Sequence, residues 1–150
     1  TATWLRPGER IVDLRLARSG ARAAMLVDDG QRTTLRVSGV VRGSDGVPNA
    51  LTEPILLPSS GSEDSVEWAG DTNLLVSAYA AKPDERVVPR IVSVDGTVRE
   101  LNPLGGLRGI SAGDDGAYYA ETEEFVFLLV GSSWRAQELD RGVRDLSFPD

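Results

Sequence analysis

The fold is decided by a stretch near the start of the chain, which reads Val12-Asp13-Leu14-Arg15-Leu16-Ala17-Arg18-Ser19-Gly20-Ala21-Arg22-Ala23-Ala24-Met25-Leu26. The apolar residues at positions 12, 14 and 16 share one face of an extended chain. The aspartate, arginine and alanine at 13, 15 and 17 share the other, as in a half-buried β-strand. Gly20 can adopt a positive φ in the turn that follows. A mostly apolar strand is expected next, over residues 23–27. The stretch therefore predicts a β-hairpin.

Weaker copies of this hairpin recur along the chain. The residues equivalent to Leu14 are Val66, Ile110 and Leu146, at intervals of roughly 36 to 52 residues, close to the roughly 40–50 residues of a four-stranded propeller blade. Asp95-Gly96 stands between two alternating segments and is the strongest short hairpin signal. No segment longer than about ten residues repeats apolar residues with helical spacing, so we expect almost no helix.

We therefore predict an all-β fold, a partial β-propeller of about three four-stranded antiparallel blades plus the first strand of a fourth. The chain is treated as one domain over residues 1–150, with blades at approximately 11–58, 65–102 and 107–140 and the start of the next at 143–150. Residues 43–49 are expected to form a polar loop, and residues 54–58, with a proline at each end, an edge strand. A two-sheet sandwich is the main alternative.

Such a set of blades does not close a ring, so exposed blade faces are expected. The remaining blades could come from a longer parent protein, or copies of the chain could associate through the open faces. The chain starts at Thr1 without a charged-then-apolar leader, and we expect it to be part of a longer protein.

Composition removes several classes of function. The chain of 150 residues has a formal net charge of −7, which disfavours binding to nucleic acid. It contains no cysteine and no histidine, so thiolate nucleophiles, zinc–thiolate sites and Ser-His-Asp mechanisms are excluded. No apolar run approaches the roughly 20 residues that span a bilayer. We expect no metal and no cofactor.

Acidic residues provide the only candidates for chemistry. The runs Asp28-Asp29-Gly30 and Asp114-Asp115-Gly116, and Asp45 with its neighbours, match the preferences of tight turns better than the ligand spacing of a calcium loop. Glu121, Glu123 and Glu124 precede the apolar segment of residues 125–130. They could supply a glycosidase carboxylate pair, but charges that protect an aggregation-prone strand are the favoured interpretation.

Aromatic and glycine-rich positions are interpreted as structural. Trp68, Tyr118 and Tyr119 fall in the repeated hairpins and are expected to fill the space between blades, whereas Trp4 or Trp134 could be an exposed partner contact. The stretch Gly105-Gly106-Leu107-Arg108-Gly109 lacks the patterns that bind phosphate.

Three stretches, in order, resemble one protein family: residues 10–22 are similar to its opening I-x-x-L-R-V-S-x-D-G-x-R, and residues 35–51 and 66–74 to the segments that follow. The family is the C-terminal β-propeller domain of the actinobacterial lipoprotein LpqB, and the similarity covers most of residues 10–116. Where its turn reads S-x-D-G, this chain has Ala17-Arg18-Ser19-Gly20, which weakens the capping of the turn.

The resemblance implies a membrane-anchored, extracytoplasmic lipoprotein whose lipidated cysteine and GerMN-type domain lie upstream of these residues. It also implies a protein partner, the extracellular part of the sensor histidine kinase of the Mtr two-component system, and a role in cell-wall homeostasis and cell division. No catalytic motif of the family is carried over.

The function expected from the sequence is a non-enzymatic protein-interaction module, with no catalytic residue and no partner-binding residue assigned. The alternative is a propeller-fold hydrolase or lyase that uses carboxylates at the end of the channel, such as Asp114 or Glu123. An enzyme should bring such carboxylates together in one pocket, whereas an interaction module should show a broad surface instead.

Overall fold

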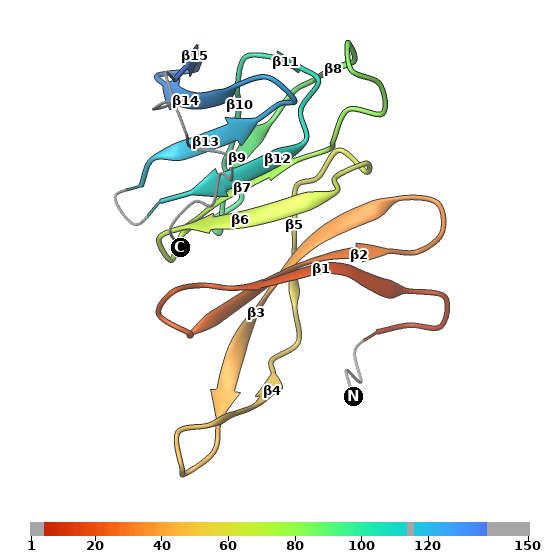
Figure 1. Cartoon of the computed structure of the whole chain (residues 1–150). Coiled ribbons are helices and arrows are strands. Elements are labelled where there is room, and N and C mark those ends of the chain that lie inside the picture. Colours follow the sequence, from red (N-terminus) through yellow and green to blue (C-terminus); the bar gives the residue numbers. More distant parts are fainter. Residues whose placement is uncertain (1–4, 114–115, 138–150) are drawn as a thin grey trace.

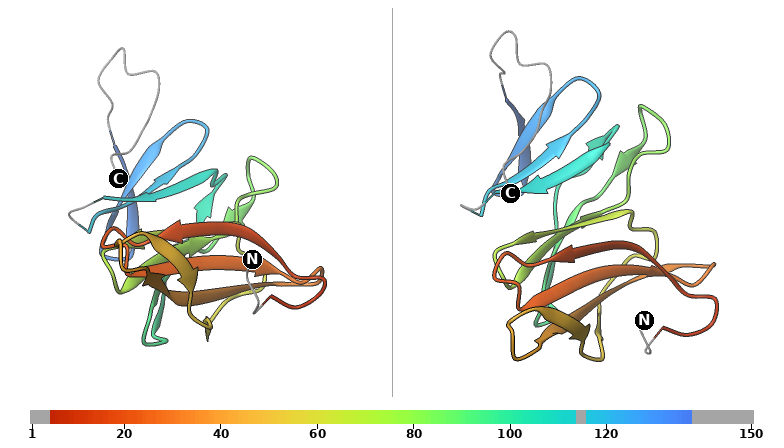
Figure 2. Two further views of the ribbon diagram at one scale, coloured as in Figure 1. Left: turned by 90° about the horizontal axis from the view of Figure 1, so that it is seen from below. Right: turned by 60° about the horizontal axis from the view of Figure 1, so that its bottom comes forward.

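The computed structural model describes residues 5–113 and 116–137, which form strands, turns and connections without any helix. Three large antiparallel sheets follow one another along these ranges. A small two-stranded sheet pairs a segment that interrupts the second sheet with a segment that precedes the third. Figures 1 and 2 show the second sheet stacked between the first and the third. This arrangement confirms the predicted all-β, partial-propeller fold. The described residues contain no helix that is long and apolar enough to cross a membrane.

The first sheet contains five strands, one more than predicted. They are β1 (Arg10–Leu16), β2 (Arg22–Asp28), β3 (Thr33–Arg42), β4 (Pro48–Leu51) and β5 (Ile55–Leu57). The additional strand is β4, which begins within the polar loop expected over residues 43–49. That loop is instead a shorter, tight turn, in which the Asp45 side chain accepts the N–H of Val47 and Gly46 has a φ of 79°. Along one edge, β3 pairs first with β5 and then, beyond Gly39, with β4.

The other sheets repeat a four-stranded pattern. The second sheet contains β6 (Ser65–Ala69), β7 (Asn73–Ser77), β9 (Arg90–Ser93) and β10 (Val98–Glu100), and the third contains β12 (Gly109–Ala112), β13 (Tyr118–Glu121), β14 (Val126–Val130) and β15 (Ser133–Ala136). The small sheet pairs β8 (Arg86–Val87) with β11 (Leu104–Gly105). The segment expected to start a fourth blade, residues 143–150, lies outside the described residues.

Two apolar layers hold the three large sheets together. The first layer, between the first and second sheets, includes Leu26, Leu35, Trp68 and Leu74. The second layer joins the second and third sheets through residues such as Leu75 and Ile110. The opening strands β1, β6 and β12 contact one another in that order. They therefore hold the positions of the inner strands of successive propeller blades.

The face of β1 that is turned toward the second sheet is the opposite of the one that the alternation favours. Leu14 and Leu16 are 46% and 56% exposed, whereas Ala17 is 3% exposed. The polar face of β1 is turned toward the second sheet, where a side-chain oxygen of Asp13 accepts the N–H of Val66 at 3.2 Å. Alternation determines which side chains share a face, but the adjacent sheet decides which face is buried. The first sheet consequently retains an exposed apolar surface.

Candidate functional site

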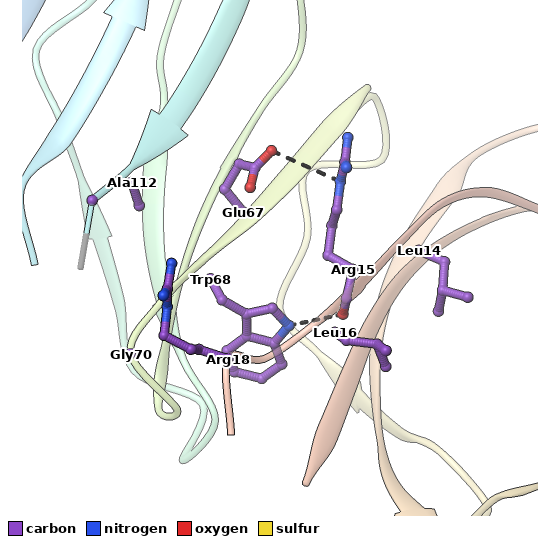
Figure 3. Close-up of a pocket in the computed structure, with 9 residues that line it drawn as sticks. Leu14, Arg15, Leu16, Arg18, Glu67, Trp68, Gly70 and Ala112 are labelled. Atoms are coloured by element: carbon purple, nitrogen blue, oxygen red, sulfur yellow. Dashed lines mark hydrogen bonds and ion pairs between the residues drawn. The ribbon is translucent and has the colours of Figure 1, made fainter. Parts of the chain in front are cut away.

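A cavity of about 590 Å³ lies where the first strands of the three large sheets converge. Its position matches one end of the propeller channel, next to the hairpin turns that follow β1, β6 and β12. Figure 3 shows most of its walls. The lining residues are Leu14, Arg15, Leu16, Arg18, Glu67, Trp68, Gly70, Ala112 and Gly113. We call this space the channel cavity.

Trp68 fixes the geometry of the channel cavity. The residue is 9% exposed, and it belongs to the apolar layer between the first and second sheets. The indole Nε1 donates a hydrogen bond of 2.9 Å to the carbonyl oxygen of Arg15, whose side chain lies in the same cavity (Figure 3). An indole N–H that is mostly buried needs such an acceptor. The predicted packing role of Trp68 is confirmed.

Arg15 is the centre of two ion pairs at the channel cavity. The guanidinium Nε of Arg15 lies 3.8 Å from Glu67 (Figure 3). It also lies 3.3 Å from Asp13, so carboxylates from two different sheets approach one cation. The Arg15 side chain is about half exposed, so water screens these pairs and each adds little stability. The pairs orient the three side chains.

Of the carboxylates predicted from the sequence, Glu121, Glu123 and Glu124 do not line the channel cavity. Glu121 ends β13, and Glu123 and Glu124 are exposed in the turn between β13 and β14, at the end of the third sheet away from Gly113. Asp114 and Asp115 lie outside the described residues. Within the ranges that the structure describes, no three acidic side chains are close enough to hold a metal ion.

The other acidic motifs form turns, as predicted. The side chain of Asp28 accepts the N–H of Gly30, and that of Asp29 accepts the N–H groups of Gln31 and Arg32. These backbone hydrogen bonds hold the pKa of Asp29 below its ordinary value, and the N–H of Thr97 does the same for the pKa of Asp95. Such bonds favour the charged carboxylate.

The other aromatic residues considered in the sequence analysis lie in different environments. Tyr118 packs against the layer between the second and third sheets, and its burial raises the pKa of the phenol. Tyr119 is half-buried on the other face of β13. Trp134 packs against the same layer as Tyr118, and its Nε1 donates to the carbonyl oxygen of Asn102 at 2.9 Å, so its role is structural. Trp4 lies outside the described residues.

A second cavity, of about 650 Å³, was not anticipated from the sequence. It lies between the loop after β7 and the turn between β13 and β14, and its lining includes Glu123, Gly105 and Gly106. Gly106 has a φ of 71°, and a Cβ on it would lie 2.5 Å from the carbonyl oxygen of Pro83. The glycine-rich stretch therefore permits a close backbone contact. This structural role is different from the phosphate binding for which the stretch was considered. We call this space the junction cavity.

The stacked sheets and their adjoining inner strands define the class of the protein, a β-propeller segment. The chain belongs to the family of the lipoprotein LpqB β-propeller domain, whose family model matches residues 1–149. This match confirms the resemblance carried by the three sequence stretches.

A comparison with solved structures supports the same architecture. The chain is similar to a structure from a study of two prolyl endopeptidases, with a TM-score of 0.52 and 19% sequence identity. The similarity covers 87% of this chain and 21% of the other, so the chain spans about a fifth of that protein. At this identity the likeness concerns the fold alone. A comparison with curated protein sequences found no significant match.

Proposed function

We propose that the domain is a non-enzymatic protein-interaction module of an extracytoplasmic lipoprotein, held at the membrane by a lipid anchor outside these 150 residues. Membership of the LpqB propeller family supports this proposal. A propeller segment provides broad, rigid surfaces without requiring a catalytic constellation.

The ion pairs at the channel cavity are the observation that carries the proposal. A hydrolase or lyase needs two carboxylates that face each other across a bound substrate, one of them able to hold a proton. Here Arg15 lies within 4 Å of both Asp13 and Glu67. One guanidinium is thus the ion-pair partner of both carboxylates. Glu123 lines a different cavity.

The proposed partner is the extracellular domain of an Mtr-type sensor histidine kinase, through which the lipoprotein would influence cell-wall homeostasis and cell division. The test is capture of the longer parent lipoprotein by the immobilised kinase domain. A parent protein that lacks residues 1–150 is the control. We expect capture of the intact protein and a strong loss with the control. Equal capture of both, or none of the correctly folded intact protein, would reject the proposal.

The exposed apolar surface of the first sheet favours a second interaction of the same kind. Leu14 and Leu16 lie on the side of β1 away from the second sheet, where they are about half exposed. The apolar residues between neighbouring sheets of the stack are buried. We propose that a second copy of the chain packs on this surface.

A further inference from the structure

The junction cavity lies at the opposite end of the third sheet from the channel cavity. Arg108, which precedes β12, lines the junction cavity, whereas Ala112, the last residue of β12, lines the channel cavity. The two spaces can therefore bind different ligands. The junction cavity has a volume of about 650 Å³, within the size range of pockets that bury a small ligand or a few residues of a peptide.

Backbone hydrogen bonds hold one wall of the junction cavity, the loop between β7 and β8. The N–H of Ala80 donates to the carbonyl oxygen of Leu107 at 2.8 Å, and that of Gly106 donates to the carbonyl oxygen of Glu85 at 2.8 Å. The carboxylate of Glu85 accepts the N–H of Ala81 at 2.6 Å. This wall is thus attached to the connection between the second and third sheets, and a ligand would not have to order it.

The opposite wall is the turn between β13 and β14, which is also closed by hydrogen bonds. The N–H of Thr122 donates to the carbonyl oxygen of Phe125 at 2.9 Å, and the N–H of Phe125 donates to the Thr122 hydroxyl at 3.2 Å. The ring of Phe125 is 49% exposed, and its centroid lies 5.9 Å from that of Phe127 in an edge-to-face arrangement. Phe127 packs against the apolar layer below. An exposed ring supported by a packed ring is a preformed apolar contact.

The charges of the junction cavity differ from those of the channel cavity. Lys82 and Arg108 supply positive charge from the loop and the connection, and Glu123 and Glu124 supply negative charge from the turn. Within the described residues, these four side chains form no ion pair, although they line the same space. Charges of both signs on different walls complement a ligand that carries both signs at its two ends.

We infer that the junction cavity binds an extended segment of the protein partner, in which an apolar side chain stands between an acidic and a basic residue. The apolar side chain would pack on Phe125, the acidic residue would face Lys82 and Arg108, and the basic residue would face Glu123 and Glu124. This inference rests on the proposed interaction function and assigns that function a surface. It does not involve the channel cavity or the exposed face of the first sheet.

The test is an NMR titration of the ¹⁵N-labelled chain with two blocked pentapeptides, Asp-Gly-Leu-Gly-Lys and the reversed sequence. We expect one of them to shift the amide signals of Gly105, Gly106 and Phe125 in a saturable manner, and a peptide with serine in place of leucine to bind about tenfold more weakly or worse. Phe125→Ser should weaken binding by about tenfold. Val130→Ser is the matched control, because Val130 is a similarly exposed apolar residue at the far end of β14.

Reversal of a charge in the junction cavity is the second part of the test. Lys82→Glu should weaken the binding of the same peptide, whereas Arg135→Glu, at an exposed position on β15, should not. The inference is overturned if neither peptide shifts these amides, if Phe125→Ser and Val130→Ser act equally, or if only an oligosaccharide such as chitotriose shifts them. Capture by the kinase domain tests the proposed function separately. If the Phe125→Ser variant of the parent protein is still captured, this site is rejected and the proposed function is retained. If the intact parent protein is not captured, the proposed function alone is rejected.

Discussion

The indole of Trp68 and the backbone carbonyl of Arg15 join the first strands of two successive sheets through a hydrogen bond of 2.9 Å. The bond crosses the layer in which the first and second sheets pack together. It links residues 53 positions apart in the sequence, so it stabilises the stacking of sheets rather than a single hairpin. Trp134 makes an equivalent bond of 2.9 Å to Asn102 beside the next layer.

Replacement of Trp68 by phenylalanine should lower the free energy of unfolding by about 1 kcal/mol or more, because the Arg15 carbonyl loses its donor while much of the packing is kept. Replacement by alanine should cost about 3–5 kcal/mol. Urea denaturation of the purified chain measures both. Trp134→Phe, which removes the corresponding bond at the other layer, is the comparison. A Trp68→Phe variant as stable as the wild type would show that the bond contributes nothing.

Gly106→Ala should destabilise the chain by more than about 1 kcal/mol, because a side chain there meets both a positive φ and the carbonyl oxygen of Pro83. Gly96→Ala is the matched control: its φ is 94°, but nothing lies within 4 Å of the added Cβ. Thermal unfolding of both variants separates the conformational cost from the cost of the close contact. Equal losses of stability would contradict a close approach at Gly106.

Glu9 should make the stability of the chain depend on pH. A hydrogen bond from Arg36, at 2.7 Å, is the main cause that holds the pKa of Glu9 below its usual 4.5. Because the folded-state pKa is the lower one, this stabilisation is complete above the unfolded pKa and is lost as the pH falls through the folded pKa. Glu9→Gln should therefore be less stable than the wild type at pH 7, with a difference that shrinks in acid.

Urea denaturation at pH 7 and at pH 3 measures this difference, and Glu53→Gln, at an exposed position, is the control. A difference between Glu9→Gln and the wild type that stays the same at both pH values would exclude the proposed linkage.

Leu16→Glu should weaken any self-association of the chain by about tenfold or more, because association would bury an unpaired carboxylate. The free energy of unfolding of the monomer should change little, since Leu16 is 56% exposed. Sedimentation equilibrium measures the association constant. Val41→Glu, at a 42% exposed position near the end of β3, is the control. If association is unchanged in the Leu16 variant, the exposed face of the first sheet is not the contact.

Local chemistry explains why the hairpins could be predicted. Gly20 and Gly96 have φ values of 76° and 94°, and the side chain of Asp95 caps its own turn, so neighbouring residues are sufficient to specify these features. The strand β4 was missed because residues 48–51 lack an alternating pattern and depend on β3 for pairing.

The features that were missed at the candidate sites depend on contacts between distant segments. The polar face of β1 is turned toward the second sheet, where Asp13 accepts the N–H of Val66 and the Arg15 carbonyl accepts the indole N–H of Trp68. An alternating pattern cannot show these contacts. The junction cavity combines a loop near Lys82 with a turn near Phe125, about forty residues further along. The sequence identified the family and the stack of sheets, whereas the surfaces between the sheets required the three-dimensional structure.

The change of partner along β3 divides the first sheet into two parts that can open separately. Up to Val37, β3 lies between β2 and β5, whereas from Val40 its outer edge is paired with β4, in a hairpin whose tip is exposed. Amide protons of the outer hairpin should therefore exchange with solvent through local fraying, long before those of the inner part, which require the sheets to separate. A peptide bond near Asp45 could be cleaved by a protease while the stacked sheets stay intact.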